Sequence, residues 1–255
     1  MTKKYQAPIV KKAFVILDAI SKSAQGLRIS EISSMLDISK STVHGITAAL
    51  EDQGAIIRDS VSKRYVIGVT LMELGKAAYE RIDFKNVARP IMEALMEQCQ
   101  ESVFLGVRNG DSVTVIDIVE SRKDFKITSP IGTALPLPAG ATGKIFLSLM
   151  EPNDLKKYLH SNPLVRYTSN TIVDQEQYET ELETVRKQGF ATDDEEYITG
   201  VRAVVVPIKR YGAYRPAIWV VGFKASMTQK KMAVIIEQTM TAAAAINKKL
   251  SILSS

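Results

Sequence analysis

The fold of the first third of the chain is decided by one stretch, Leu27-Arg-Ile-Ser-Glu-Ile-Ser-Ser-Met-Leu-Asp-Ile-Ser-Lys-Ser-Thr-Val-His-Gly-Ile-Thr-Ala-Ala-Leu-Glu-Asp-Gln-Gly54. Two short helical patterns lie in it, and each starts with a serine, Ser30 or Ser39, whose hydroxyl can cap the free N–H groups of a helix start. Asp37 and Ile38 supply the turn between them. The stretch therefore predicts a helix-turn-helix.

The flanking sequence completes this unit. Before the stretch, Phe14, Leu17 and Ile20 recur at three-residue spacing, which puts them on one apolar stripe of a helix expected over about residues 11–21. After the stretch, residues 55–68 predict two short strands around a polar turn. Three helices followed by a hairpin are typical of a winged helix-turn-helix.

The outer face of the second helix of the motif suits double-stranded DNA. Val43, Ile46 and Leu50 share one face, so small and polar residues occupy the opposite face. A major groove admits one helix, and such a face can approach the base edges. The residues expected to contact DNA are Lys40, Ser41, Thr42 and His44 on this helix and Lys63 and Arg64 on the hairpin, with Lys3, Lys4, Lys11 and Lys12 as further phosphate contacts. The alternative is a protein-docking module with a solvated basic face.

Most of the net positive charge of the chain lies in this unit. Residues 1–82 hold twelve basic and eight acidic residues, a balance of +4, whereas the whole chain carries +5. The remaining residues therefore contribute only +1, which makes the first third the part suited to a polyanion.

Composition excludes several classes of protein. With 45% hydrophobic and 24% charged residues, the 255-residue chain is typical of a core-forming protein of one or two domains. A single cysteine, Cys99, cannot form an intramolecular disulfide, and it forms no zinc set with the distant His44 and His160. We expect no metal, no cofactor and no membrane partner, and a cytoplasmic location.

The rest of the chain predicts a mixed α+β unit. Asn109-Gly110-Asp111 favours a tight turn between two strands. Strands are expected over residues 102–108, 112–119, 203–208 and 217–223, and helices over residues 69–82, from Pro90 to about Gln100, and over residues 141–150, 153–160, 174–188 and 229–250. An antiparallel sheet with helices packed on it is large enough here for an internal pocket.

Lys40-Ser-Thr-Val-His44, with Tyr65-Val-Ile-Gly68 and Leu71-Met-Glu-Leu-Gly75 after it, resembles the DNA-binding domain of the IclR family of bacterial transcription regulators. The family commonly has arginine after the histidine, where this chain has Gly45. That departure removes a phosphate or guanine contact and puts the usual operator pattern of the family in doubt.

The resemblance extends over essentially the full length. Leu135-Pro-Leu137, Gly143-Lys144, Gly189-Phe-Ala191 and Gly200-Val-Arg202 stand in the order of the family's effector-binding domain, which has a GAF-like fold. The organisation it implies is a winged helix-turn-helix DNA-binding domain at residues 1–68, a linker helix at 69–83 and an effector-binding domain at 84–255.

The resemblance also implies an effector site in the second domain. The matching positions are Leu135, Gly140, Ala141, Thr142, Asp193, Ala203, Val220 and Gly222. Backbone N–H groups at Ala141 and Thr142 are expected to hold a ligand carboxylate, and Asp193 to accept a hydrogen bond from a ligand hydroxyl. Several relatives have cysteine or hydroxyl residues at the positions of Ala203, Val220 and Gly222, so this lining favours a larger, partly apolar or aromatic carboxylate. The alternative is a pocket that has drifted or is occupied differently.

Other chemistry finds little support in the sequence. Gly140-Ala-Thr-Gly-Lys144 is no phosphate-binding loop, because Pro138 and Ile145 replace the required glycine and hydroxyl residue. Asp194, Glu195 and Glu196 are expected in a solvated acidic turn, and Cys99 as a small buried side chain.

The function that these observations predict is a ligand-responsive transcription regulator of a catabolic operon, not an enzyme. We expect it to bind a palindromic double-stranded DNA operator as a homodimer or a dimer of dimers, and to sense a small organic carboxylate. The alternative is a small-molecule enzyme with a fused DNA-binding head, although the chain has no nucleophile and base at recognisable spacing.

Overall fold

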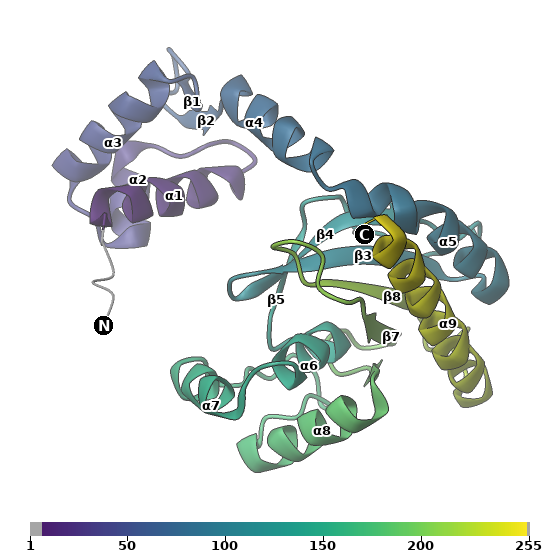
Figure 1. Cartoon of the computed structure of the whole chain (residues 1–255). Helices are drawn as coiled ribbons and strands as arrows, with labels where there is room; N and C mark the ends of the chain where they lie inside the picture. Colours follow the sequence, from purple (N-terminus) through teal and green to yellow (C-terminus); the bar gives the residue numbers. More distant parts are fainter. Residues whose placement is uncertain (1–6, 254–255) are drawn as a thin grey trace. The chain divides into compact units, whose positions relative to one another are not determined.

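The computed structural model describes residues 7–253, and the chain divides into two compact units, Met1–Arg81 and Ile82–Ser255. Figure 1 shows the elements of each unit. The boundary between Arg81 and Ile82 lies inside the segment expected to link the domains, residues 69–83.

The first unit has the order of elements of a winged helix-turn-helix. It contains α1 (Pro8–Ser21), α2 (Ile29–Leu36), α3 (Lys40–Asp52), β1 (Ile56–Arg58), β2 (Tyr65–Ile67) and α4 (Val69–Glu80). β1 and β2 pair antiparallel, with Ile57 opposite Val66. Ile16, Ile32, Val43 and Tyr65 bring the three helices and the hairpin into one buried apolar core.

Two local predictions in this unit were wrong. Phe14 is 69% exposed, because a strict three-residue spacing drifts around a helix, and the buried stripe of α1 instead contains Ile16 and Ile20. Ser30 lies inside α2 and does not cap it. The carboxylate of Glu31 accepts the backbone N–H of Arg28 over 2.7 Å and satisfies that donor at the helix start.

The second unit is an α+β domain built on one antiparallel sheet of six strands in the order β5-β4-β3-β8-β7-β6. Its strands are β3 (Ser102–Asn109), β4 (Ser112–Val119), β5 (Ala134–Pro136), β6 (Ala191–Asp194), β7 (Val201–Pro207) and β8 (Pro216–Phe223). Its helices are α5 (Asp83–Cys99), α6 (Gly140–Ser148), α7 (Pro152–Ser161), α8 (Gln175–Gln188) and α9 (Gln229–Leu253).

Helices cover both faces of this sheet. α5 and α9 pack together on one face, and α6 and α8 lie on the other (Figure 1). On the α6 side, Phe104 of β3 and Trp219 of β8 stack with ring centroids 5.7 Å apart and join a buried cluster with Phe146 of α6 and Leu182 of α8. The long antiparallel strands thus place one apolar face toward α6, where the pocket described below lies.

Three elements of this unit were not predicted correctly. α5 begins at Asp83 and runs through Pro90, because the buried face of the helix, including Phe84 and Met92, compensates for one missing backbone hydrogen bond. The short strands β5 and β6 were missed. β6 contains Asp193 and Asp194, and aspartate is rare in strands, so its pairing with β7 was not evident from the sequence.

Within residues 7–253, no helix combines the length and the apolar character needed to cross a lipid bilayer.

Candidate functional site

The start of α3 is capped as the sequence predicted. The hydroxyl of Ser39 accepts the backbone N–H of Thr42 over 3.3 Å and lies 2.8 Å from the hydroxyl of Thr42. Asp37, in the left-handed conformation with φ of 51°, ends α2 and makes the turn. The cap fixes the direction in which α3 leaves the turn.

The outer face of α3 is exposed and free of acidic residues along its first ten positions. Lys40, Ser41 and His44 are exposed, whereas Thr42 is half-buried and its hydroxyl is shared with the cap. Val43 and Ile46 bury the opposite face. The predicted contact residues therefore lie together at one end of one helix, with Ser41 and His44 more accessible than Thr42.

The hairpin between β1 and β2 separates the two residues that the sequence had grouped. Lys63 is exposed at the turn. Arg64 is half-buried, and its guanidinium donates to both carboxylate oxygens of Glu31 over 2.9 Å and to the carbonyl of Gly26 over 2.7 Å. This geometry argues against Arg64 as a phosphate contact, because all of its charge is directed into its own unit.

Two other pairs of lysines were expected near the DNA. Lys11 and Lys12 of α1 are exposed. Lys3 and Lys4 lie outside the described residues.

The second unit contains a cavity of about 230 Å³ between the sheet and the start of α6. Most of its wall is apolar. The lining residues are Phe104, Val115, Ile127, Thr128, Ser129, Leu135, Ala139, Ala141, Thr142, Asp193, Tyr197, Ile198, Val201, Ala203, Trp219 and Val221. Five of the eight positions expected from the sequence are among them, namely Leu135, Ala141, Thr142, Asp193 and Ala203.

The polar groups of the cavity gather at the start of α6. The backbone N–H groups of Ala141 and Thr142 belong to the first turn and therefore have no intrahelical acceptor. No side chain caps this helix start either. Gly140 has φ of +54°, and a Cβ atom there would collide with the carboxylate of Asp193. That carboxylate therefore lies directly against the first turn of α6, and Gly140 makes the close approach possible.

Asp193 is 6% exposed and comes from β6, opposite Ala203 of β7. Its Oδ1 accepts the backbone N–H of Glu196 over 2.7 Å. Burial raises the pKa of Asp193, although the Glu196 N–H and the Lys144 ammonium act in the opposite direction. The cavity thus contains one buried carboxyl group beside a set of free backbone donors.

Val220 and Gly222 do not line this cavity. Successive strand residues point to opposite faces, and in β8 the residues on the cavity side are Trp219 and Val221. Val220 is fully buried on the α5 and α9 side, and a Cβ atom at Gly222 would meet Glu101. The assignment of Val220 and Gly222 as effector contacts was therefore displaced by one residue along the strand.

The acidic residues Asp194, Glu195 and Glu196, at and after the end of β6, do not form a solvated turn but pair with basic side chains. Glu196 pairs with Lys144 over 2.6 Å, Asp194 pairs with Arg202 over 2.6 Å, and Glu195 pairs with Lys224. Burial raises the pKa of Glu196, while Lys144 lowers it. The sequence contained no signal for the partner lysine, because Lys144 is 52 positions away from Glu196 along the chain.

No group of three His, Cys, Asp or Glu side chains in the described part of the chain could hold a metal ion. Cys99 is buried, and burial raises the pKa of its thiol, in line with a small structural side chain.

Comparisons with known proteins cover both units. Residues 9–60 match the family model described as IclR helix-turn-helix domain, and residues 76–248 match Bacterial transcriptional regulator IclR C-terminal. The HTH-type transcriptional regulator BhcR of Paracoccus denitrificans is 34% identical over 77% of this chain and 70% of its own length.

Solved structures of IclR proteins have the same fold as this chain. The IclR structure from Thermotoga maritima has 31% identity and a TM-score of 0.66 over 94% of this chain and 98% of its own. An IclR homologue from Microbacterium hydrocarbonoxydans, solved with 4-hydroxybenzoate, has the same fold with 20% identity and a TM-score of 0.74, over 96% of this chain and 99% of its own. Matches to both units in one chain identify it as a member of the IclR family of bacterial transcription regulators, which are ligand-responsive DNA-binding proteins.

Proposed function

We propose that this regulator senses a small organic carboxylate, aromatic acids included, and controls a catabolic operon. The observation that supports this proposal is the distribution of polar groups in the cavity. The wall is mostly apolar, whereas free backbone N–H groups and Asp193 lie together at one end. A ligand with one anionic end and an apolar body matches this arrangement.

The ligand would be oriented by the first turn of α6. Its carboxylate would accept the N–H groups of Ala141 and Thr142, and its body would lie against Leu135, Val221 and Trp219. The structure from Microbacterium hydrocarbonoxydans, which holds 4-hydroxybenzoate, supports an aromatic acid as the first ligand to test.

The DNA would be contacted by α3 and the hairpin. Lys40, Ser41 and His44 would lie along the major groove, and Lys63 would neutralise a phosphate beside it. Two copies of such a unit suit the two halves of a palindromic operator, so a homodimer or a dimer of dimers is the expected assembly.

The experiment is a thermal-shift screen of aromatic and aliphatic carboxylates, followed by operator titrations with each acid that stabilises the protein. Thr142→Trp, at a residue that lines the cavity, should block the ligand and abolish the response while operator binding without ligand is retained. Thr184→Trp, on the exposed face of α8, is the matched control and should respond as the wild type does.

Stabilisation by pyruvate-sized acids and not by aromatic acids would contradict the preference for an aromatic body. Equal stabilisation of Thr142→Trp and the wild type would show that the ligand binds elsewhere.

A further inference from the structure

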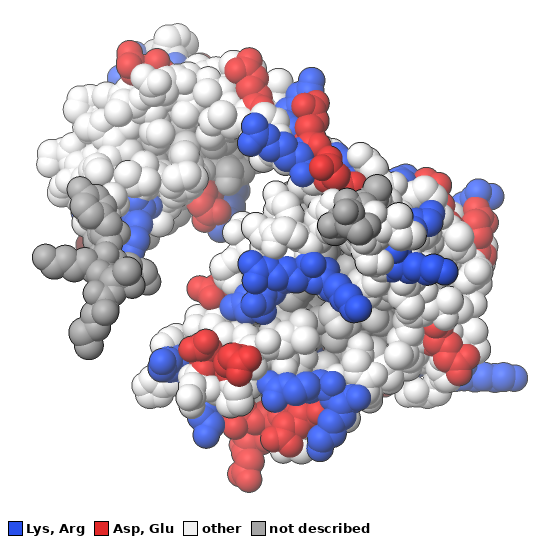
Figure 2. All heavy atoms as spheres, in the orientation of Figure 1, with Lys and Arg blue, Asp and Glu red and all other residues white. Residues whose placement is uncertain are grey.

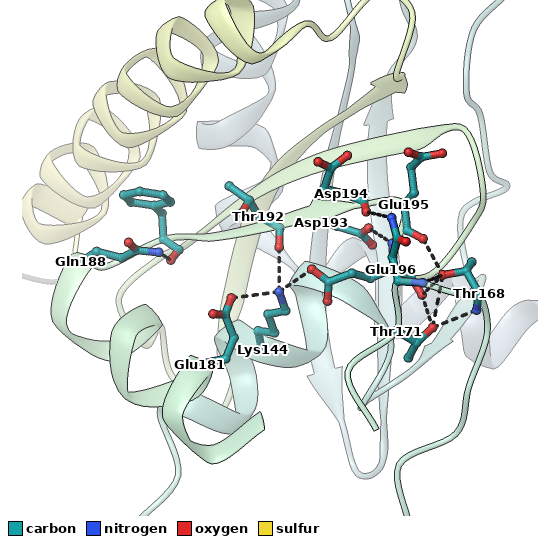
Figure 3. Close-up of polar contacts among 12 residues, drawn as sticks. Lys144, Thr168, Thr171, Glu181, Gln188, Thr192, Asp193, Asp194, Glu195 and Glu196 are labelled. Atoms are coloured by element: carbon teal, nitrogen blue, oxygen red, sulfur yellow. Dashed lines mark hydrogen bonds and ion pairs between the residues drawn. The ribbon is translucent and has the colours of Figure 1, made fainter. Parts of the chain in front are cut away.

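Four ionisable side chains form a cluster directly behind the polar end of the cavity, namely Lys144 of α6, Glu181 of α8, Asp193 of β6 and Glu196 (Figure 3). Lys144 and Asp193 are buried and Glu196 is mostly buried, whereas Glu181 is about one-third exposed. The Lys144 side chain is only 2% exposed. Its ammonium group donates to Glu181 over 2.9 Å, to Glu196 over 2.6 Å and to the carbonyl of Thr192 over 3.1 Å. Asp193 joins the cluster through the backbone N–H of Glu196.

The cluster contains one cation and three carboxyl groups. If all three carboxyl groups were ionised, the cluster would carry two uncompensated negative charges, and only Glu181 among them is substantially exposed to solvent. The two carboxyl groups most deeply involved are Glu196, whose side chain is 14% exposed, and Asp193. Burial raises the pKa of both, so each accepts a proton more readily than an exposed carboxyl group does.

The groups that face this cluster from the surrounding elements offer no second compensating cation. From α8 comes the Tyr178 hydroxyl, which is buried and also has a raised pKa. From β6 comes Asp194, which already binds Arg202 of β7. Glu195 binds Lys224. Among the described residues that line the cavity, none is a lysine, an arginine or a histidine.

An anionic ligand at the first turn of α6 would add a further negative charge beside Asp193, because the Asp193 carboxylate lies against Gly140. Two carboxylates cannot share such a buried place at low cost unless they share a proton. We propose that the pocket takes up one proton with its carboxylate effector, so that Asp193 meets the effector as a neutral carboxylic acid and donates a hydrogen bond to the effector carboxylate. This inference rests on the proposed ligand class, and it makes Asp193 a specificity-determining donor for carboxylates rather than an acceptor for hydroxyl groups.

The proton comes from the solvent and stays on Asp193 while the effector is bound. Binding raises the proton affinity of Asp193, and by linkage a proton on Asp193 raises the affinity for the anion equally. Affinity therefore increases as the pH falls. Between the pKa values of Asp193 in the free and the bound protein, the dissociation constant should rise by up to about tenfold for each pH unit.

The test is calorimetry on the full-length protein with benzoate, 4-hydroxybenzoate and pyruvate as probes. Titrations at one pH in two buffers with different ionisation enthalpies give the number of protons taken up with each probe. We expect close to one proton at neutral pH, and weaker binding at about pH 8 than at about pH 6.

The variant Asp193→Asn distinguishes a proton-accepting Asp193 from an Asp193 that only supports the structure of the pocket. An amide is a neutral isostere that can donate as the carboxylic acid does, so the variant should bind the probe at every pH with an affinity near that of the wild type at low pH. It should take up no proton. Glu181→Gln removes one negative charge from the cluster at a side chain that is 32% exposed, and should reduce the proton uptake at neutral pH.

Two control variants address other groups that titrate. The chain has two histidines, and His160→Gln removes the one in the second unit, which does not line the cavity. Asp124→Asn removes an exposed carboxyl group in the same unit. Both controls should take up protons as the wild type does.

The outcomes separate the two levels of the proposal. If no carboxylate binds the wild type, the proposed ligand class is wrong and this inference fails with it. If a carboxylate binds without proton uptake, or if Asp193→Asn binds it at least tenfold more weakly at every pH, the ligand class stands and the inference alone is overturned.

Discussion

Arg64 holds the hairpin to the rest of the DNA-binding unit. Its guanidinium binds Glu31 of α2 with two parallel hydrogen bonds and also reaches the carbonyl of Gly26. The hydrogen bond from the backbone N–H of Arg28 and the guanidinium of Arg64 keep the pKa of Glu31 below its ordinary value. Lys63, the neighbouring residue, has no such partner among the described side chains and lies exposed.

Adjacent basic residues should therefore respond differently to substitution. Lys63→Asn, which suits the left-handed φ of 59° at that position, should leave the unfolding temperature nearly unchanged. It should weaken binding to operator and random DNA alike, and reduce the steepness of log K against log salt concentration by about 1. Arg64→Ala should lower the unfolding temperature by about 5 °C. Thermal unfolding and salt titrations of DNA binding compare the two variants. Equal salt slopes for Lys63→Asn and the wild type would show that Lys63 does not contact a DNA phosphate.

Gly45 offers a second test on the outer face of α3. It is exposed, and apart from its own helix turn a Cβ atom there would meet nothing within 4 Å, so the helix has room for a long side chain. Gly45→Arg should raise the affinity for DNA and steepen its salt dependence, because it adds a cation where the groove is expected. Gly45→Gln is the uncharged control for the gain in helix propensity. Fluorescence anisotropy with operator and random DNA compares them, and equal affinities for the two variants would contradict a DNA contact at this position.

Strands and helices were predictable to different degrees. Residues Ser112–Val119 of β4 are a strand as predicted, because Asn109-Gly110-Asp111 fixes the turn before it. β6 could not be predicted, because the burial of Asp193 depends on α6, which approaches it only in the folded chain. The cavity positions that the family resemblance implied were correct on β5, β6 and β7 and, for Ala141 and Thr142, on α6. On β8 the implied positions, Val220 and Gly222, were displaced by one residue, because pairing with β3 and β7 decides which residues of β8 face the cavity.

The faces of β8 give a prediction of their own. Val221→Trp should fill the cavity and abolish thermal stabilisation by 4-hydroxybenzoate or any other acid found to bind the wild type. Val220→Ala should lower the free energy of unfolding by roughly 2 kcal/mol, because it empties space in the core between the sheet and α9, and should leave the ligand-induced shift intact. Thermal unfolding with and without ligand distinguishes them. Loss of the ligand-induced shift in Val220→Ala and its retention in Val221→Trp would mean that Val220, and not Val221, faces the cavity.

The proposed ligand pocket lies in one compact unit and the proposed DNA-binding surface in the other, so the proposal describes a two-site protein. A ligand changes DNA affinity only through its different affinities for the two conformations of the protein, and the effect is reciprocal.

The reciprocity can be measured. If saturating effector changes operator affinity by a factor of roughly 5 to 150, saturating operator should change effector affinity by the same factor. Operator titrations with and without effector, and effector titrations with and without operator, give the two factors. Unequal factors would mean that the ligand acts through a further process, such as a change of assembly. Random DNA is the control and should change effector affinity less than the operator does.

The Arg64–Glu31 pairing has an evolutionary consequence. Because the hairpin is tied to α2, and α2 packs with α3 on one core, the distance from the exposed face of α3 to Lys63 is set by the fold. If α3 and Lys63 contact DNA as proposed, substitutions on the outer face of α3 alter which bases are read without moving the phosphate contact of Lys63. Sequence preference and overall affinity are thereby free to diverge separately among descendants of this regulator, one on the helix and the other at the hairpin turn.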